Sequence, residues 1–139
     1  MQIPGFTTQQ ILFDSERSIV LRCIRNEDSK SVVLKVLHEN KINPDEVGRF
    51  RHEYNILKNL GGCAVVACYG IGRVQGAPYL ILEDCGCESL KSFRPYDGLS
   101  LREKLQIAIK ISGALGTVHH ASIIHKDLNP ANILYNSAE

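Results

Sequence analysis

The sequence predicts an α+β fold, in which an antiparallel sheet with one helix precedes a mainly helical part. Three observations lead to this prediction. Short aliphatic and β-branched runs, separated by polar turns, fill most of the first 83 residues. A capped amphipathic helix interrupts these runs between residues 43 and 62. A longer apolar helix follows at 101–121, so strands and helices are segregated along the chain.

Composition limits the classes of function before any motif is considered. The chain has 139 residues, 44% of them hydrophobic, and a net charge of +1. It can therefore bury a core, and it lacks the basic excess of a nucleic-acid or lipid-binding surface. No apolar run is long enough to span a membrane, and the start lacks signal-peptide features, so we expect a cytoplasmic location. The five cysteines include no Cys-x-x-Cys pair, which favours small buried side chains over a disulfide framework or a zinc site.

The first three strands are predicted from apolar residues at 11–13, 19–21 and 32–37, with polar turns at 14–18 and 26–29. Alternation places Val33, Lys35 and Leu37 on one face of the third strand. A lysine buried among apolar residues needs a carboxylate or a phosphate as its partner. The alternative is an edge-strand lysine that reaches solvent.

A helix is predicted after these strands. Asn43 and Pro44 are typical of a helix start, and the glycines at 61 and 62 are typical of a helix end. Glu53 lies beside the apolar stripe of this helix, so it can point toward Lys35. The alternative is a surface pair with Arg49, one turn away.

Two more strands, 63–69 and 78–83, complete a predicted five-stranded sheet, with a turn through Gly70, Gly72 and Gly76. The chain then becomes polar, which indicates a linker at 84–100. In the helix at 101–121, apolar residues cover more than one face, so this helix is expected to pack against other elements. The predicted organisation is therefore 1–83, 84–100 and 101–139.

A short motif near the end carries the chemistry. Residues 123–134 read Ile-Ile-His-Lys-Asp-Leu-Asn-Pro-Ala-Asn-Ile-Leu, a His-x-Asp and a later Asn between apolar pairs. Phosphoryl transfer needs a carboxylate that orients the attacking hydroxyl and an oxygen ligand for Mg²⁺, and a short loop can hold both. Asp127 and Asn132 are the candidates. The alternative is a polar turn between strands.

With these pieces in order, the chain resembles the N-terminal portion of a eukaryotic-type Ser/Thr protein kinase domain. The residues that carry the resemblance are Val-Val-Leu-Lys at 32–35, Glu53 and the His-x-Asp loop. The resemblance implies a kinase N-lobe at 1–83, a hinge and linker at 84–100, and a partial helical C-lobe at 101–139 that ends after the catalytic loop. Leu82 resembles the gatekeeper, and residues 83–85 resemble the hinge that reads adenine.

The same resemblance implies ATP and Mg²⁺ as cofactors and a protein Ser or Thr as substrate. Lys35 would bind the phosphates while Glu53 holds it. Asp127 would orient the hydroxyl, and His125 would brace the loop. Asn132 would bind Mg²⁺, with the second ligand outside this chain. The residues implied to contact ATP are Val20, Val33, Lys35, Leu82, Glu83, Cys85 and Leu134.

More narrowly, the Arg-Phe-Arg-His-Glu-Tyr helix and the Leu-Glu-Asp-Cys-Gly segment resemble the kinase-like N-terminal module of large bacterial signalling proteins with ATPase, GAF and histidine kinase parts. Two features depart from the kinase pattern. Phe13, Ser15 and Ser18 stand where the phosphate-binding loop has glycines, which hinders close backbone approach to phosphate. Asn129 replaces a lysine that neutralises the transferred group.

The sequence also stops at Glu139, before any Asp-Phe-Gly motif, so we expect a truncated fragment that is inactive alone. The helix at 101–121 would then self-associate or recruit a partner chain. Two other functions stay open. One is a pseudokinase or scaffold. The other is a small-molecule phosphotransferase of the aminoglycoside or choline kinase type, which the short segment at 85–100 disfavours. Neither nucleic-acid binding nor membrane insertion is expected.

Overall fold

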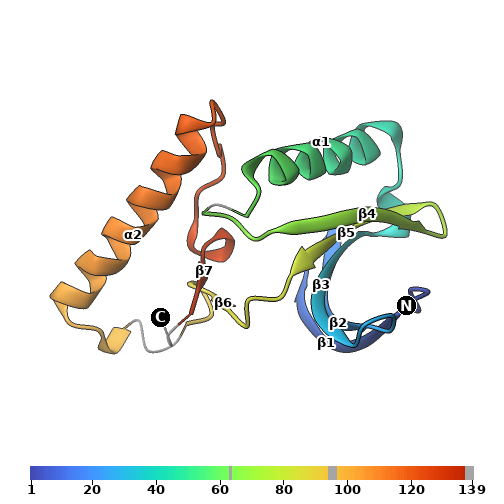
Figure 1. Cartoon of the computed structure of the whole chain (residues 1–139), viewed down its shortest axis with the longest axis horizontal. Coiled ribbons are helices and arrows are strands. Elements are labelled where there is room, and N and C mark those ends of the chain that lie inside the picture. Colours follow the sequence, from blue (N-terminus) through green and yellow to red (C-terminus); the bar gives the residue numbers. More distant parts are fainter. Residues whose placement is uncertain (63, 94–96, 137–139) are drawn as a thin grey trace. The chain divides into compact units, whose positions relative to one another are not determined.

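The computed structural model describes residues 1–62, 64–93 and 97–136 (Figure 1). The chain divides into two compact units. The first unit comprises residues 1–62 and 66–84, and the second comprises residues 63–65 and 85–139 as far as they are described. The segment expected to be a linker, 84–100, includes residues 94–96, which lie outside the described part.

The first unit is built on a five-stranded antiparallel sheet, as predicted. The strand order is β1-β2-β3-β5-β4, so β1 and β4 are the edges. The β1–β2 register shifts twice, between Thr8 and Gln10 and between Ile11 and Phe13. The strands are β1 (Phe6–Asp14), β2 (Ser18–Arg25), β3 (Lys30–Leu37), β4 (Cys68–Val74) and β5 (Ala77–Glu83).

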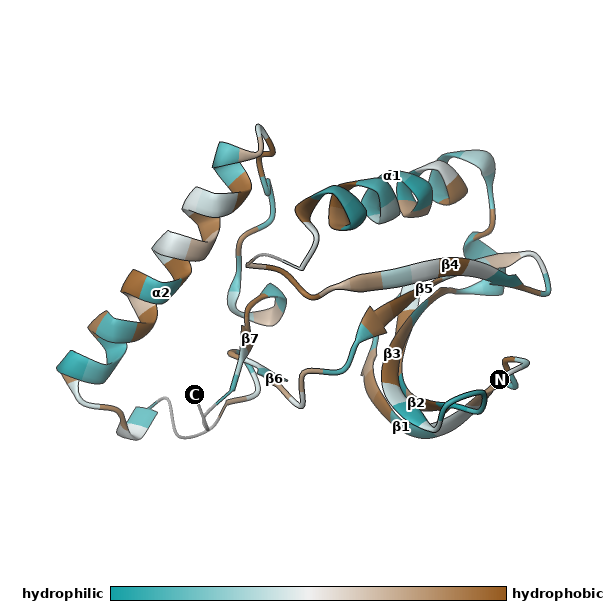
Figure 2. Cartoon of the chain, viewed as in Figure 1, coloured by the Kyte–Doolittle hydropathy of each residue, from teal (hydrophilic) through white to brown (hydrophobic). Residues whose placement is uncertain are grey.

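One face of this sheet carries the larger apolar core. Alternating residues of β2 and β3 point to this face. Hydrophobic side chains from the segment before β1 and from the β4–β5 hairpin join them. Figure 2 shows the corresponding hydrophobic colour along β2, β3 and β5. The buried members are Ile3, Leu21, Cys23, Val32, Leu34, Val36, Val74 and Ala77.

Helix α1 (Pro44–Leu60) packs on the opposite face, after the short helix η1 (Glu39–Lys41). Phe50 is 1% exposed and forms a second core cluster with Leu37 and Leu80. The predicted ends are confirmed. The Asn43 side chain accepts a hydrogen bond of 3.0 Å from the Glu46 amide, and Gly61 ends the helix with a φ of 60°.

The prediction for β4 was wrong in its bounds. The strand begins at Cys68 rather than 63, a residue outside the described part, and it continues through Gly70 and Gly72 to Val74. The turn that was expected at all three glycines uses only Gly76, with a φ of 84°. Gly72 belongs in the strand because the Tyr79 ring occupies the space of a side chain, 2.4 Å from where a Cβ atom would lie.

The second unit contains α2 (Leu101–His120), η3 (Pro130–Asn132) and a two-stranded sheet of β6 (Glu88–Ser89) and β7 (Leu134–Tyr135). Helix α2 begins at a capping box between Ser100 and Glu103 and ends one residue before the predicted end. Ile107 and Val118 are its buried side chains. On the remaining surface, Leu105 is 54% and Ile109 is 70% exposed.

The cysteines depart in part from the prediction, which favoured small buried side chains over disulfides. Cys85 and Cys87 are joined by a disulfide, with their Cα atoms 5.2 Å apart. Among the other described cysteines, Cys23 is a buried core residue, as expected, and Cys68 is half-buried.

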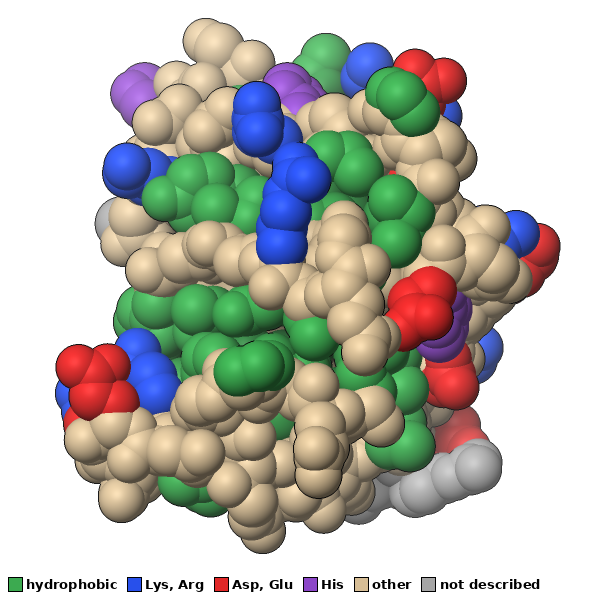
Figure 3. Space-filling view, turned by 90° about the vertical axis from the view of Figure 1, so that its right-hand side faces the viewer, with side chains coloured by type: hydrophobic (Ala, Val, Ile, Leu, Met, Phe, Trp, Pro, Cys, Tyr) green, Lys and Arg blue, Asp and Glu red, His purple; other side chains and the backbone are tan. Residues whose placement is uncertain are grey.

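The described surface is mixed in charge. Figure 3 shows acidic and basic side chains on one face beside hydrophobic patches, which fits the net charge of +1. No helix within the described residues is both long and apolar enough to cross a membrane.

Candidate functional site

Lys35 on β3 and Glu53 on α1 form an ion pair. The Lys35 Nζ atom lies 2.8 Å from Oε1 and 2.9 Å from Oε2 of Glu53, so the ammonium donates to both carboxylate oxygens. The same Nζ atom lies 5.7 Å from the centre of the Phe50 ring. The alternative partner for Glu53 is not used, because Arg49 pairs with Glu46 at 3.2 Å.

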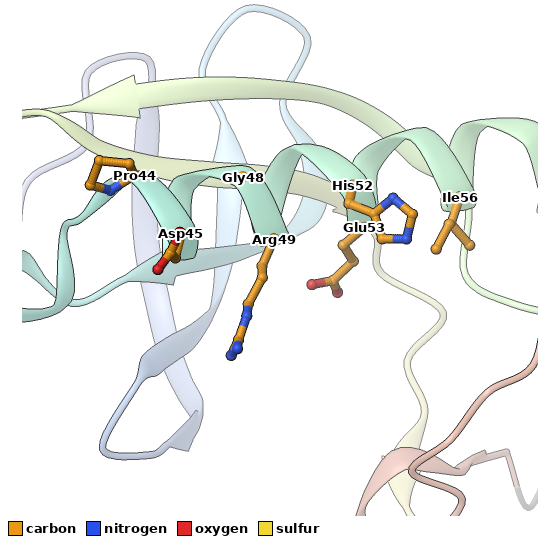
Figure 4. A pocket seen from close by; sticks show the side chains of 7 residues that line it. All are labelled: Pro44, Asp45, Gly48, Arg49, His52, Glu53 and Ile56. Atoms are coloured by element: carbon orange, nitrogen blue, oxygen red, sulfur yellow. The ribbon is translucent and has the colours of Figure 1, made fainter.

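This pair is less buried than the sequence suggested. The side chains of Lys35 and Glu53 are 29% and 38% exposed, because α1 covers the sheet at Leu37 and Leu80 but leaves the ion pair at its margin. In Figure 4, Glu53 projects from the same side of α1 as Asp45 and Arg49, over an open hollow lined by this helix alone. The ammonium therefore remains within reach of a ligand from solvent.

Apolar residues on the same face of the sheet extend from this ion pair. Val20 is the register partner of Lys35, and Val33 is the partner of Leu82. Directly paired residues share a face, and so do residues two apart on one strand, so all four predicted residues lie on one side of the sheet. Val20, Val33 and Leu82 are half-buried. The first unit thus presents a partly open apolar surface beside a positively charged group.

The β1–β2 loop is attached to the segment that leads into α1. Three side-chain pairs join them: Asp14 with His38 at 2.9 Å, Glu16 with Lys41 at 2.7 Å, and Arg17 with Glu46. The Lys41 hydrogen bond and charge lower the pKa of the Glu16 carboxyl below its ordinary value. The His38 amide also donates to the Arg17 carbonyl oxygen at 3.0 Å.

Sequence reasoning missed this attachment. It noted that side chains replace glycines in the loop. It did not note that basic residues after the third strand could pair with the acidic residues of the loop region. The signal available was the acidic Asp14 and Glu16 opposite basic residues at 38 and 41.

The end of β5 is held by a second polar network that sequence reasoning also missed. Arg22 donates to both carboxylate oxygens of Asp84, at 2.8 and 3.2 Å, and the Ser31 hydroxyl donates to the same carboxylate at 2.6 Å. Glu83 accepts a bond from the Ala67 amide at 3.2 Å and donates its own amide to the Ala67 carbonyl at 2.9 Å. An available signal was that Arg22 lies two residues after Val20 on β2, which puts a charged side chain on the same face as the apolar Val20.

In the second unit, the loop before η3 brings the predicted catalytic and metal residues together. The amide Nδ2 of Asn132 donates to Asp127 Oδ2 at 3.0 Å and to its backbone carbonyl at 2.9 Å. Asn129 donates to Asp127 Oδ1 at 3.1 Å and caps η3 through Ala131. The Asp127 amide donates to His125 Nδ1 at 3.2 Å.

These bonds explain why asparagine is useful at position 129. Its amide fixes the carboxylate of Asp127 and begins a short helix, although it supplies no positive charge. Because Asn132 donates through Nδ2, its Oδ1 atom remains as the end that can bind a cation. Within the residues that the structure describes, no group of three His, Cys, Asp or Glu side chains could hold a metal ion.

The predicted site residues thus fall into two groups. The first unit brings together Lys35 and Glu53 and places Val20, Val33 and Leu82 on their side of the sheet, with Glu83 at the end of β5. The second unit brings together His125, Asp127 and Asn132. It also contains Cys85, which is bonded to Cys87, and Leu134 of β7, which is 50% exposed.

Comparison with known proteins gives a single consistent result. The family model described as the protein kinase domain matches residues 6–139. The chain is 30% identical over 133 residues to serine/threonine-protein kinase PknK of Mycobacterium tuberculosis, an alignment covering 94% of this chain and 12% of that protein. Calcium-dependent protein kinase 5 of Plasmodium berghei is 29% identical over 117 residues, an alignment covering 84% of this chain and 20% of that protein. Serine/threonine-protein kinase pakG of Dictyostelium discoideum is 28% identical over 134 residues, an alignment covering 88% of this chain and 11% of that protein. The chain therefore spans at most a fifth of the length of these relatives.

Proposed function

Because this chain belongs to the protein kinase domain family, we propose that it is the ATP-binding part of a Ser/Thr protein kinase. The observation that carries this proposal is the Lys35–Glu53 ion pair at the margin of a half-buried apolar surface. The similar proteins include some named serine/threonine-protein kinases, which supports serine or threonine as the phosphoryl acceptor. Residues 1–83 would form the N-lobe, 84–100 the hinge and linker, and 101–139 part of the C-lobe.

The first unit fits a nucleotide in two respects. Val20, Val33 and Leu82 offer an apolar surface to the adenine ring, and Glu83 and Cys85 belong to the segment whose backbone would bond its edge. Lys35 offers an ammonium to the phosphates. Glu53 holds that ammonium through two hydrogen bonds. The lysine side chain is therefore already ordered before the nucleotide binds.

The second unit fits the acceptor side of the reaction. Asp127, held by Asn129 and Asn132, would orient the serine or threonine hydroxyl and accept its proton. Asn132 would bind Mg²⁺ through Oδ1, and the bound cation would neutralise charge on the transferred phosphoryl group. His125 accepts the Asp127 amide and so keeps the loop in place. Leu134 would contact the nucleotide beside this loop.

Nucleotide binding by the chain tests the proposal first. Thermal unfolding is followed with and without ATP and Mg²⁺ for the wild type, Lys35→Ala and the control Lys30→Ala, which removes an exposed lysine from the start of the same strand. ATP should raise the melting temperature of the wild type and the control, because a ligand of the folded state stabilises it. The Lys35 variant should lose most of this rise. An unchanged melting temperature in the wild type would show that this chain does not bind ATP.

A pseudokinase or scaffold is the second candidate, and the β1–β2 loop is the observation that favours it. Side chains replace glycine there, and three side-chain pairs attach the loop region to the segment before α1 and to α1 itself. A loop held in this way is less able to close its backbone over phosphates. ATP binding without phosphate transfer in a full-length relative, unchanged by the substitution that matches Asp127→Ala, would favour this candidate. Transfer that Asp127→Ala abolishes would exclude it.

A further inference from the structure

The segment from Cys85 to Cys87 contains two bonded cysteines separated by one residue. Their Cα atoms lie 5.2 Å apart, within the range of about 4.4–6.8 Å that disulfides normally span. Gly86 has a φ of 64°, a left-handed conformation that glycine adopts without steric cost. The backbone therefore turns between the two cysteines, and this turn lets their side chains meet.

This pair lies in one of the covalent connections between the two units. Asp84 is the last residue of the first unit, and the second unit continues from Cys85. Before the pair, Arg22 and Ser31 hold the Asp84 carboxylate. After it, β6 pairs with β7 through Glu88. Residues 85–87 thus connect two anchored points, and closing a ring through them removes backbone rotations from the connection.

The two sulfurs are more accessible than that of Cys23. Cys85 and Cys87 are half-buried beside an exposed glycine, so a small reagent can reach them. Cys23 is buried in the core. Burial raises the pKa of both the Cys23 and the Cys68 thiols, which leaves less of the reactive thiolate. Because Cys85 and Cys87 also lie close enough to bond to each other, oxidation is expected to select this pair.

We propose that Cys85 and Cys87 form a reversible redox site that controls the flexibility of this connection. The oxidant is a small-molecule disulfide, such as oxidised glutathione. One cysteine thiolate attacks a glutathione sulfur, breaks its S–S bond and releases one glutathione. The other cysteine thiolate then attacks the protein sulfur of the mixed disulfide, closes the ring and releases the second glutathione. The protein loses two electrons and two protons, which convert the glutathione disulfide into two thiols.

Mass spectrometry tests the first part of this proposal. The chain is equilibrated at increasing ratios of oxidised to reduced glutathione, unfolded in acid, alkylated and cut with trypsin. Both cysteines lie in the tryptic peptide 74–91, whereas Cys63 and Cys68 lie in 59–73 and Cys23 lies in 23–25. Peptide 74–91 should pass from doubly alkylated to internally bonded at a defined ratio, and excess reduced glutathione should reverse the change. Peptide 23–25 should stay alkylated throughout.

Three results would overturn the redox site. Peptide 74–91 could remain doubly alkylated at every ratio, it could bond to another peptide, or it could accumulate stable glutathione adducts. Cys85→Ser and Cys87→Ser serve as controls, because each leaves one thiol that can form only the adduct. The mass spectrometry uses no nucleotide, so its outcome is independent of the proposed kinase function.

Proteolysis after the exposed Glu88 tests control of flexibility. Cleavage requires local opening of the backbone, which ring closure opposes. A glutamate-specific protease should therefore cut the reduced chain several-fold faster than the oxidised chain. In the two serine variants the cleavage rate should not depend on the glutathione ratio. Equal rates for the oxidised and reduced wild type would show that the bond does not control the connection.

Discussion

At the scale of single residues, Gly72 shows how an absent side chain determines the packing of a strand. A Cβ atom at this position would lie 2.4 Å from a carbon of the Tyr79 ring, and that ring also makes an edge-to-face contact with Phe6. We expect Gly72→Ala to lower the free energy of unfolding by about 1–3 kcal/mol through overpacking. Urea unfolding of the purified variant measures this loss.

Gly70 provides the matched control for this substitution. It lies in the same strand, but its added Cβ atom would meet Ile81 at 3.6 Å, an ordinary van der Waals contact. Gly70→Ala should therefore leave the stability nearly unchanged. Equal losses for the two variants would contradict the role given to the Tyr79 ring, since strand propensity alone would then explain both.

Asp28 gives a pH dependence at the same scale. The Arg25 hydrogen bond, aided by the Lys30 amide, lowers the pKa of the Asp28 carboxyl from 3.8 to about 2. A group with a lowered folded-state pKa stabilises the protein above its ordinary pKa, and this contribution is lost as the pH falls. The wild type should therefore be more stable than Asp28→Asn above pH 4, and the difference should shrink between pH 4 and about pH 2.

Unfolding curves at a series of pH values measure this difference. Glu27→Gln, at the neighbouring position of the same turn, is the control for general charge effects. A constant gap between wild type and Asp28→Asn across this pH range would show that the Arg25 contact does not act through the Asp28 charge.

At the scale of elements, the start of α2 depends on its capping box. Ser100 accepts from the Glu103 amide at 3.3 Å, and Glu103 accepts from the Ser100 amide at 2.7 Å. Ser100→Ala should cost about 1 kcal/mol of helix stability. Hydrogen exchange of the amides in the first turn should become faster. Ser112→Ala is the control, because its hydroxyl donates to the carbonyl of Ala108 within the helix and does not cap its start.

The charge of Glu103 adds a pH dependence to this cap. The Ser100 hydrogen bonds lower the pKa of the Glu103 carboxyl below its ordinary value of 4.5. The cap is therefore complete above that pH and weakens as the pH falls below it. Exchange in the first turn of the wild type should accelerate on acidification, and exchange in Ser100→Ala should accelerate less.

At the scale of the whole molecule, the apolar surface of α2 is the feature with the clearest consequence. Leu105 and Ile109 are 54% and 70% exposed, one turn apart on the helix. Exposed apolar patches favour association between copies. The double variant Leu105→Gln/Ile109→Gln should self-associate less than the wild type while keeping its melting temperature, as measured by sedimentation velocity and thermal unfolding.

Ile107 is the matched control on the same helix. It is 8% exposed, so Ile107→Ala should lower the free energy of unfolding by about 2–5 kcal/mol. It should not reduce self-association. If the double glutamine variant associates as strongly as the wild type, this face of α2 is not the contact between copies.

The sequence by itself determined the features that depend on near neighbours. The ends of α1 follow from Asn43 and Gly61, and the alternation of β3 puts Lys35 on the face where α1 packs. The spacing of His125, Asp127 and Asn132 suffices for the hydrogen bonds of that loop, because all of them form within a few residues. Fold class and family could be predicted for these reasons, whereas the catalytic and binding roles of these residues remain predictions.

Only the tertiary structure decided the contacts between distant segments. Arg22 and Asp84 are 62 positions apart, and Arg17 and Glu46 are 29 apart, so no local pattern selects either partner. The bounds of β4 were wrong for the same reason, because Gly72 belongs to the strand only once Tyr79 lies across it. Local propensity depends on a residue and its neighbours, whereas register and ion pairing depend on which surfaces meet when the chain folds.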